Sequence, residues 1–410
     1  MARWLIAFLL LLAPSVAHAQ RGPLERQNNL SDVDSAATAL SNIGGNNASN
    51  LSTGTLPAAR LPASGVTPGT FGSATTAPQI TVDASGRITA AGNVAISGGG
   101  SAAIFSPQGR LTLTSGSPVM SADVVGATTI YYDDYSGNAV PIYNGTASVM
   151  YPITGGEISL ALNATDEPAG SLYDVFGISV SGTLTLCAGP AWTSTTARAD
   201  AIGIAATGYW TNSVSLPHCY AGATDEGPVS AEEGTYLGTF YANAAGAVTM
   251  QFQPAAVAGG SGCMMGLSNA YNQVPVSCIE RNSATWTYSQ STWRVADGSA
   301  ANGVTFVSGL VSGNAAATYQ VEGEMNGVGT SIEIGIDFDN TTATPLAMDV
   351  EATGASTVDY RTLHVFAVLP SPIGLHSAYA MEWVYAPGAN PAFDPSSTSA
   401  PYFLVLRMEM

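Results

Sequence analysis

Five aromatic residues in the second half of the chain have the types and spacing found where proteins bind sugars or other proteins. Trp286, Tyr288 and Trp293 fall on and around one predicted hairpin, and Trp383 and Tyr385 fall on another. Rings exposed on a surface stack against sugar rings and anchor interfaces. Packing of each ring in a core is the alternative, and the spacing alone does not separate the two interpretations.

A short acidic motif is a weak candidate for a metal site. Asp337-Phe338-Asp339-Asn340 places two carboxylates, Asp337 and Asp339, on one face of a predicted strand, followed by an amide. Oxygen ligands of this kind suit Ca²⁺, but the twelve-residue calcium loop is absent. An acidic strand end explains the motif more simply, so we predict no metal and no cofactor.

The motifs of common enzyme classes do not occur in the sequence. Gly259-Gly260-Ser261-Gly262 is a loop pattern and not the Gly-x-Ser-x-Gly motif of a nucleophile. The chain has no lysine, which rules out the phosphate-binding loop signature. We therefore predict that the chain is not an enzyme. Glycan cleavage needs only two suitably placed carboxylates, and the sequence leaves that alternative open.

Four cysteines offer a further kind of chemistry. They are Cys187, Cys219, Cys263 and Cys278, and no Cys-x-x-Cys spacing occurs among them. In an exported chain they form two disulfides in one of three pairings. The alternative is four small buried hydrophobic residues.

Composition limits the classes of partner. The chain has 410 residues, of which 46% are hydrophobic and only 10% charged, and all 11 basic residues are arginine. The net charge is -18, whereas a protein that binds the phosphate backbone of nucleic acid needs clustered basic residues. Nucleic acid is therefore not expected as a partner. The acidic residues are scattered, which favours a role in solubility.

The first 20 residues have the pattern of a secretory signal. Arg3 precedes an apolar run from Leu5 to Ala13, and Ala17-His18-Ala19 matches a cleavage site. The run is too short to span a bilayer, and no later stretch is long enough, so no membrane span is predicted. A wrongly assigned start site or an N-terminal docking peptide is the alternative.

The elements that must carry these residues begin with a stretch that cannot bury a core by itself. Leu30, Val33, Ala37 and Leu40 recur at helical spacing after a possible N-cap, Ser31, and Gly44-Gly45 supplies the stop. The sequence predicts a short coiled-coil-like helix within residues 21–45, and a helix laid on a domain is the alternative. Residues 46–100 form an extended shaft that ends in a hairpin turning at Asp83-Ala84-Ser85-Gly86.

The rest of the chain has the pattern of strands. Residues 101–296 form a β-rich segment with one possible helix, Thr195–Ile204, and residues 297–410 form a β-sandwich of jelly-roll type. The strands expected in the first segment are Leu111–Leu113, Thr128–Tyr132, Ile158–Leu162, Leu172–Val180, Thr183–Cys187, Tyr236–Tyr241, Val248–Phe252, and Trp286–Tyr288 paired with Trp293–Val295. Those expected in the second are Val304–Val307, Tyr319–Glu324, Ser331–Phe338, Leu346–Val350, Tyr360–Val368, Ala378–Tyr385 and Tyr402–Met408.

Several elements together resemble the tail-fibre proteins of bacteriophages and prophages. The run from Asn29-Leu30-Ser31-Asp32-Val33 to Asn42-Ile43-Gly44 is similar to their "NNLSDL…ALxNLG" element. Thr53 to Pro62 and Gly65 to Gly72 resemble their shaft elements, and so does Gln79 to Thr89. The segment from Leu111 to about Val311 is similar to a β-rich module of phage structural proteins. The resemblance covers residues 28–310 well and the C-terminal segment loosely.

The resemblance implies an elongated homotrimer in a virion tail appendage. Its partners would be other tail components and a glycan or protein receptor on the bacterial host surface, and its activity would be adhesion without catalysis. A signal peptide is unusual for such a fibre, and it favours an exported, prophage-derived adhesin located outside the cell. A fibre-borne polysaccharide depolymerase and a purely structural virion component are further alternatives. The predicted fold is an all-β fibrous trimer with a short N-terminal helix, a thin shaft and C-terminal β-sandwich domains.

Overall fold

A computed structural model describes residues 35–42, 63–73, 76–95, 106–204, 208–311, 314–352, 358–385, 391–394 and 402–410. The chain divides into two units, Met1–Ser101 and Ala102–Met410. The predicted signal segment, the expected N-cap Ser31 and the shaft element Thr53 to Pro62 lie outside the described residues. The regular structure of the described part is almost entirely β, which confirms that the chain is all-β.

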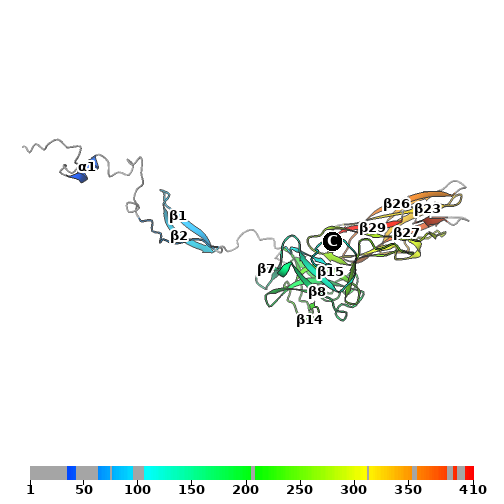
Figure 1. The fold of residues 1–410 in the computed structure, drawn as a ribbon, viewed down its shortest axis with the longest axis horizontal. Coiled ribbons are helices and arrows are strands. Elements are labelled where there is room, and N and C mark those ends of the chain that lie inside the picture. Colours follow the sequence, from blue (N-terminus) through cyan, green and yellow to red (C-terminus); the bar gives the residue numbers. More distant parts are fainter. Residues whose placement is uncertain are drawn as a thin grey trace, which may run out of the picture. The chain divides into compact units, whose positions relative to one another are not determined.

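The first unit contains a short helix and a hairpin. Helix α1 spans Ala36–Asn42, and the Oγ of Ser35 accepts a hydrogen bond from the backbone N–H of Thr38 at 3.2 Å. Strands β1 (Thr76–Val82) and β2 (Ile88–Ala95) pair in antiparallel register (Figure 1), which confirms the predicted hairpin. The short side chain of Asp83 fixes the turn, because its carboxylate accepts hydrogen bonds from the backbone N–H groups of Ser85 and Arg87.

The hairpin leaves apolar side chains in solvent on both of its faces. Ile80 and Val82 are more than half exposed, and Val94, on the opposite face, is almost half exposed. A two-stranded hairpin is marginally stable in water unless further strands or a helix cover a face. The described part of this unit therefore has no apolar core of its own.

The second unit holds the remaining strands. Up to residue 221 they are β3 (Gly109–Thr112), β4 (Val124–Ala127), β5 (Thr129–Asp134), β6 (Ala139–Tyr143), β7 (Ser148–Pro152), β8 (Glu157–Ala161), β9 (Ser171–Val180), β10 (Thr183–Ala188), β11 (Ile202–Ile204), β12 (Trp210–Asn212) and β13 (Tyr220–Ala221). Then follow β14 (Thr224–Asp225), β15 (Thr235–Ala244), β16 (Ala247–Met250), β17 (Cys263–Met265), β18 (Leu267–Asn269), β19 (Pro275–Glu280), β20 (Trp286–Thr287) and β21 (Arg294–Val295). Two 3₁₀ turns, Thr154–Gly156 and Ala296–Gly298, complete this part.

Eight strands complete the described part of the chain. They are β22 (Gly303–Ser308), β23 (Asn314–Met325), β24 (Ser331–Phe338), β25 (Ala347–Ala352), β26 (Asp359–Pro370), β27 (Gly374–Tyr385), β28 (Ala392–Asp394) and β29 (Phe403–Glu409). All seven strands predicted after residue 297 are confirmed, and β28 is an addition. Every strand range predicted between residues 101 and 296 also overlaps an observed strand.

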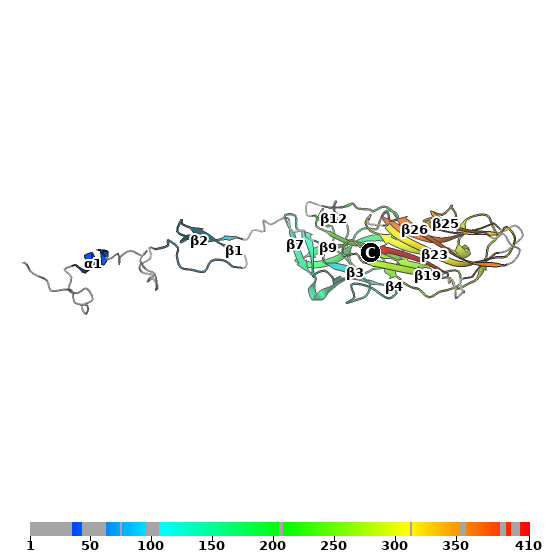
Figure 2. The ribbon, with the colours of Figure 1, turned by 90° about the horizontal axis from the view of Figure 1, so that it is seen from above.

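Two sheets form the sandwich that carries the predicted aromatic residues. One contains β22-β27-β24-β25 and continues through β17 and β16 to β15 and β9; the other has the order β19-β29-β23-β28-β20, with β26 on the free edge of β23. Figures 1 and 2 show the long strands β23, β26 and β29 side by side in the part of this unit that the last strands of the chain form. Strands from both sides of the boundary predicted at residues 296 and 297 pair with each other, as β17 does with β22.

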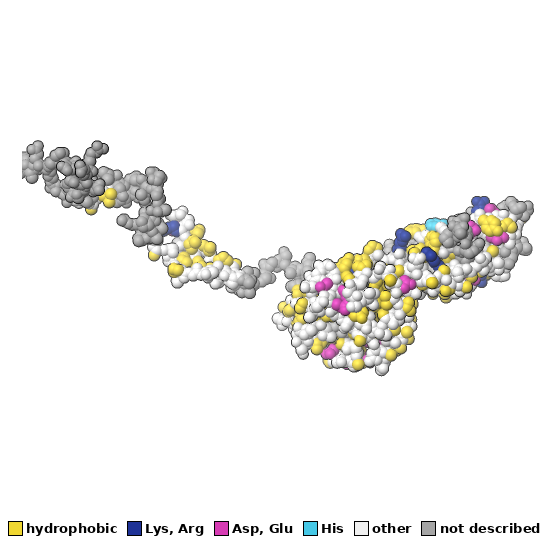
Figure 3. All heavy atoms as spheres, in the orientation of Figure 1, with side chains coloured by type: hydrophobic (Ala, Val, Ile, Leu, Met, Phe, Trp, Pro, Cys, Tyr) yellow, Lys and Arg dark blue, Asp and Glu magenta, His cyan; other side chains and the backbone are white. Residues whose placement is uncertain are grey.

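The two inner faces interdigitate to make the core. Alternate residues of β23, among them Ala317, Tyr319 and Val321, are fully buried and face Ile332, Ile334 and Ile336 of β24 within one apolar cluster. The alternation explains why these strands are readable in the sequence, because a two-residue period places one face inward. On the face shown in Figure 3, charged side chains are thinly scattered.

Two predicted elements are wrong, and in both cases long-range contacts override the local pattern. Thr195–Ile204 is not helical: Arg198 is drawn into a buried ion pair with Asp174 of β9, at 2.6 Å, and Ile202–Ile204 forms strand β11. The hairpin expected between Trp286–Tyr288 and Trp293–Val295 does not form either. Instead β20 pairs with β28 and β21 pairs with β27.

Within the described residues, no helix is long and apolar enough to cross a membrane.

Both cysteine pairs form disulfides, Cys187–Cys219 and Cys263–Cys278. The first ties β10 to the loop before β13. The second joins β17 of one sandwich sheet to β19 of the other, so it links the two layers directly.

We predict that replacing Cys263 and Cys278 together by alanine lowers the free energy of unfolding by about 3 kcal/mol, the chain-entropy value for a loop of this size. The two cysteines are 15 residues apart. Urea unfolding followed by tryptophan fluorescence measures the change. As a control, the Cys187→Ala/Cys219→Ala variant, with a separation of 32, should lose slightly more. An unchanged midpoint in the first variant would contradict the prediction.

Candidate functional site

Two of the five predicted surface rings do not lie on the surface. Trp286 and Tyr288 are more than nine-tenths buried, so the expectation of exposed rings is wrong for both. Trp286 stacks on Phe393 with ring centroids 5.3 Å apart, as its strand pairs with β28. Tyr288 lies beneath Arg294, whose guanidinium carbon is 3.9 Å from the ring centroid.

A buried carboxylate explains why these rings turn inward. Glu382 of β27 is fully buried; one carboxylate oxygen accepts a hydrogen bond from Nε1 of Trp286 at 2.6 Å, and the other from Nε of Arg294 at 2.7 Å. Burial raises the pKa of Glu382 to about 7, although Arg294 and Trp286 act in the opposite direction. Trp286 and Glu382 belong to different sheets, so this group links the layers.

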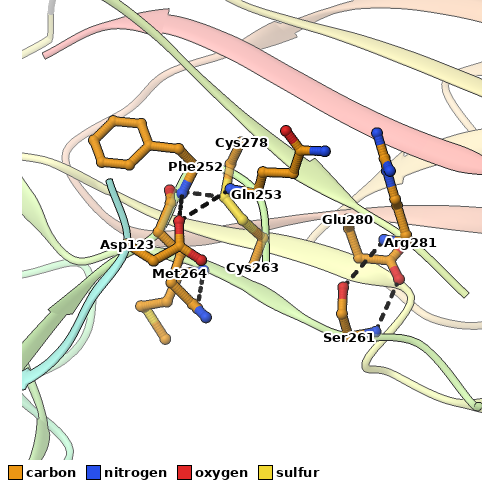
Figure 4. The surroundings of a disulfide bond; sticks show 10 residues. Asp123, Phe252, Gln253, Ser261, Cys263, Met264, Cys278, Glu280 and Arg281 are labelled. Carbon is orange, nitrogen blue, oxygen red and sulfur yellow. Dashed lines mark hydrogen bonds between the residues drawn. A yellow bond between two sulfur atoms is a disulfide. The ribbon is translucent and has the colours of Figure 1, made fainter. Parts of the chain in front are cut away.

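A second buried carboxylate lies in the same inner layer. Glu280 of β19 is fully buried and accepts hydrogen bonds from the hydroxyl of Tyr402 at 2.8 Å and from the backbone N–H of Ser261 at 3.1 Å. Burial raises its pKa to about 8, against the effect of both hydrogen bonds. Glu280 and Ser261 flank the Cys263–Cys278 disulfide (Figure 4). Ser261 therefore has a structural role in its glycine-rich loop.

The other predicted rings lie on or near the outer face of the first sandwich sheet. Trp383 is half-buried and Tyr385 is half exposed, and both alternate with buried neighbours on β27. The antiparallel register of β21 and β27 places Trp293, the half-buried residue before Arg294, at the level of Trp383. The structure therefore brings three of the five predicted rings to one region.

Neighbouring strands extend this region. Across β27, β24 and β25, the register aligns Trp383, Glu333 and Val350 in one row, and Met348 lies one row further along the outer face. Val350 and Met348 are each about half exposed. We call Trp383, Tyr385, Met348 and Val350, with Glu333 between them, the aromatic face. Partial burial raises the pKa of Glu333.

Rings beside a carboxylate suit a sugar, since the rings contact its C–H surface and the carboxylate accepts hydrogen bonds from its hydroxyls. The sequence identified the rings of this face. The position of Glu333 beside Trp383 could not be predicted, because it depends on the pairing of β24 with β27, which is not local.

In the acidic motif Asp337–Asn340, the carboxylate of Asp339 binds other protein groups. One oxygen of Asp339 lies 2.6 Å from Nδ1 of His376, and the other accepts a hydrogen bond from the backbone N–H of Ser377 at 2.7 Å. Asp337 is buried at the end of β24, and burial raises its pKa. No group of three or more His, Cys, Asp or Glu side chains in the described part of the chain is arranged to hold a metal ion.

A separate cleft of about 450 Å³ lies away from all the predicted site residues. The hairpin of β6 and β7, the end of β9 and the loop before β15 form its walls. Its lining includes Tyr143, Asn144, Tyr151, Glu226 and Glu233. These residues were not predicted from the sequence, because their segments carry no periodic pattern, and the signal Asn144-Gly145 indicates only a turn.

Comparison with known proteins leaves the chain without an established family. No family model matches it, and no curated protein does. Among solved structures, the insecticidal delta-endotoxin Cry8Ea1 from Bacillus thuringiensis is 7% identical with a TM-score of 0.18, covering 74% of this chain and 52% of that one. A glycoside hydrolase family 43 arabinoxylan arabinofuranohydrolase from Bacillus subtilis is 13% identical with a TM-score of 0.17, covering 79% and 58%. The chain thus spans little more than half of either protein, and neither likeness bears on fold or function.

The Glu280 carboxyl predicts a pH-dependent stability. Its pKa is about 8 in the folded state against 4.5 for the free group, so the folded state keeps a proton that the unfolded state loses between these values. The contribution of Glu280 to the free energy of unfolding therefore falls as the pH rises from 4.5 to about 8. We expect Glu280→Gln, which is always neutral, to remove this part of the decline. The check is the melting temperature of both proteins across that range. Parallel pH profiles would contradict the assignment.

Proposed function

We propose that this protein is a trimeric attachment protein of the tail-fibre type, whose C-terminal sandwich binds glycan on a bacterial surface. The observation that carries the proposal is the aromatic face. Trp383 and Tyr385 lie beside Glu333 and two exposed apolar residues on one sheet, and Tyr385 is half exposed. The fibre elements in the N-terminal sequence supply the structural half of the proposal.

The hairpin supports self-association. Its two faces expose Ile80, Val82 and Val94, which one copy of the chain leaves uncovered within its described part. Packing three copies around a common axis buries such residues without requiring charge, in keeping with a chain of which 10% is charged. The neighbouring helix α1, with seven residues, is also below the length at which isolated helices are stable.

The two disulfides support a location outside the cytoplasm, either secreted or on a virion assembled under oxidising conditions. Disulfides persist in secreted and surface proteins and are rare in the cytosol. Both pairs lie in the second unit, which also carries the aromatic face.

The trimer predicts a specific mass. Light scattering after size exclusion should give three times the chain mass, and Ile80→Asp/Val82→Asp should shift the protein towards single chains, because six charges would be buried around the axis. As a matched control, Thr81→Asp/Gln79→Asp places the same charges on the other side of β1 and should weaken assembly less. A compact monomer of the unchanged protein would rule out the trimer.

Glycan binding predicts a loss at the aromatic face. We expect Trp383→Ala and Tyr385→Ala each to weaken binding of the full chain to host cells and to an immobilised glycan array by about tenfold, which corresponds to ~1.4 kcal/mol. Tyr360→Ala serves as the control, since this ring is equally exposed on the opposite sheet of the sandwich.

Three results would count against the binding proposal. Binding unchanged in both variants would exclude the aromatic face as the site. No binding by the unchanged protein would favour a purely structural component. Steady release of reducing ends from capsule or lipopolysaccharide would favour a depolymerase.

A further inference from the structure

The cleft between the β6–β7 hairpin and the loop before β15 has the dimensions of a ligand site. Its volume of about 450 Å³ falls within the range of ~300–1,000 Å³ typical of small-molecule pockets. Nothing in the sequence motifs or in the role proposed for the aromatic face involves it. We call it the tyrosine cleft, after Tyr143 and Tyr151, which are both half-buried in its wall.

The floor of the tyrosine cleft is rigid. Ile178 and Val229 line it and are buried in an apolar cluster that contains the Cys187–Cys219 disulfide. Val229 also exchanges two backbone hydrogen bonds with Leu216, at 2.9 and 3.0 Å. A floor fixed by a disulfide and by backbone pairing keeps its shape without a ligand, which lowers the entropy cost of binding.

The loop that supplies Glu226 is fixed as well. The neighbouring Asp225 accepts hydrogen bonds from the backbone N–H groups of Cys219 and Gly227, at 3.1 and 3.0 Å, and its other oxygen lies 2.6 Å from Nδ1 of His218. The backbone N–H of Glu226 itself donates to the carbonyl of Cys219 at 2.9 Å. Glu226 is thus held at the cleft by its backbone, and its side chain is left to line the cleft.

The opposite wall places Glu233 against the hairpin turn. The Oδ1 of Asn144 accepts hydrogen bonds from the backbone N–H groups of Thr146 and Ala147, at 3.1 and 3.0 Å, which fixes the turn. Gly145 has φ +85°, a conformation that favours glycine, and a Cβ at this position would lie 3.5 Å from a carboxylate oxygen of Glu233. The carboxylate of Glu233 therefore lies near the backbone of this turn.

The charges of the lining select the ligand. Among the described residues that line it, Glu226 and Glu233 are charged and none is an arginine. Two carboxylates repel an anion and attract a cation, more strongly in a cleft than in bulk water. They also accept hydrogen bonds from hydroxyl and ammonium groups, while the two tyrosine rings offer apolar faces and hydroxyls. A ligand that uses all of these groups has rings, hydroxyls and a positive charge.

We propose that the tyrosine cleft binds a short saccharide that carries an unacetylated amino group. The carboxylates of Glu226 and Glu233 bind the ammonium group and adjacent hydroxyls, and Tyr143 and Tyr151 contact the sugar rings. This inference rests on the cleft alone and is independent of the aromatic face.

Calorimetric titration of the full chain at neutral pH and low salt tests the proposal with three disaccharides. They are the β-1,4-linked glucosamine dimer, its N,N′-diacetyl counterpart and digalacturonate. We expect the amino disaccharide to bind most tightly, the acetylated one about tenfold more weakly, and the acidic one not at all. Equal affinity for the acidic disaccharide, or no binding of the amino one, would overturn the proposal.

Matched variants locate the binding. Glu226→Gln/Glu233→Gln keeps the shape of the cleft and should weaken the amino disaccharide about tenfold or more while changing the acetylated one less than about threefold. Tyr151→Ala should weaken both about tenfold. Tyr360→Ala, an exposed ring outside both the cleft and the aromatic face, should leave both affinities unchanged, so it controls for the loss of a surface ring. Unchanged binding in the glutamine variant would overturn the proposal, and that variant keeps the test decisive should Tyr151→Ala not fold.

Discussion

The sandwich depends on a carboxylate that is shut off from water between its two sheets. Glu382 lies on one sheet and receives a hydrogen bond from Trp286 of the other, while Arg294 binds its second oxygen. Removing one partner of a buried charge costs on the order of 3–5 kcal/mol, because the remaining charge has no compensation. Glu382 therefore requires both Trp286 and Arg294 as hydrogen-bond donors. Tyr288 fills the space beneath the guanidinium of Arg294.

Buried groups across the second unit show how a chain poor in charge uses the charges it has. Only 10% of its residues are charged, yet Arg110, Asp174, Glu280 and Glu382 are almost fully buried. The hydroxyl of Tyr402 binds Glu280, and its ring packs edge-on against both Trp286 and Tyr319. These hydrogen bonds are directional, so they fix how the two sheets face each other, which apolar contacts alone do not. The outer surface is left with few charges and with exposed rings and aliphatic side chains.

The strands could be predicted from the sequence because their signal is local. In β24 the alternation of Ile332, Ile334 and Ile336 with smaller or polar residues is complete within the segment, and the observed bounds are those predicted. Which strands pair with each other, in contrast, is not a local property of the sequence. Trp286–Tyr288 and Trp293–Val295 have the spacing of a hairpin, but β20 and β21 join strands about a hundred residues further along the chain. The two-residue period of a strand also does not show which of its faces is buried. The burial of Trp286 and the exposure of Tyr385 were therefore equally compatible with the pattern. The tyrosine cleft could not be predicted from the sequence for a related reason. Glu226 and Glu233 come from a loop whose position depends on a disulfide and on Asp225.

The two units differ in how completely a single chain buries their apolar side chains. The sandwich closes its own apolar layer, links its sheets by a disulfide and pairs its inner carboxylates with donors. The hairpin does none of this: Ile80, Val82 and Val94 remain exposed, and its turn depends on one aspartate that is itself in solvent contact. Apolar burial contributes roughly 25 cal/mol per Å², and a ribbon of two strands has too little inner surface to offset the entropy of ordering it. Burial of these apolar side chains therefore requires a surface from outside the hairpin. In the trimer that we propose, such a hairpin would become ordered only when copies of the chain meet, whereas the sandwich buries its apolar layer within one chain. Assembly and glycan binding would then be encoded in separate parts of the sequence.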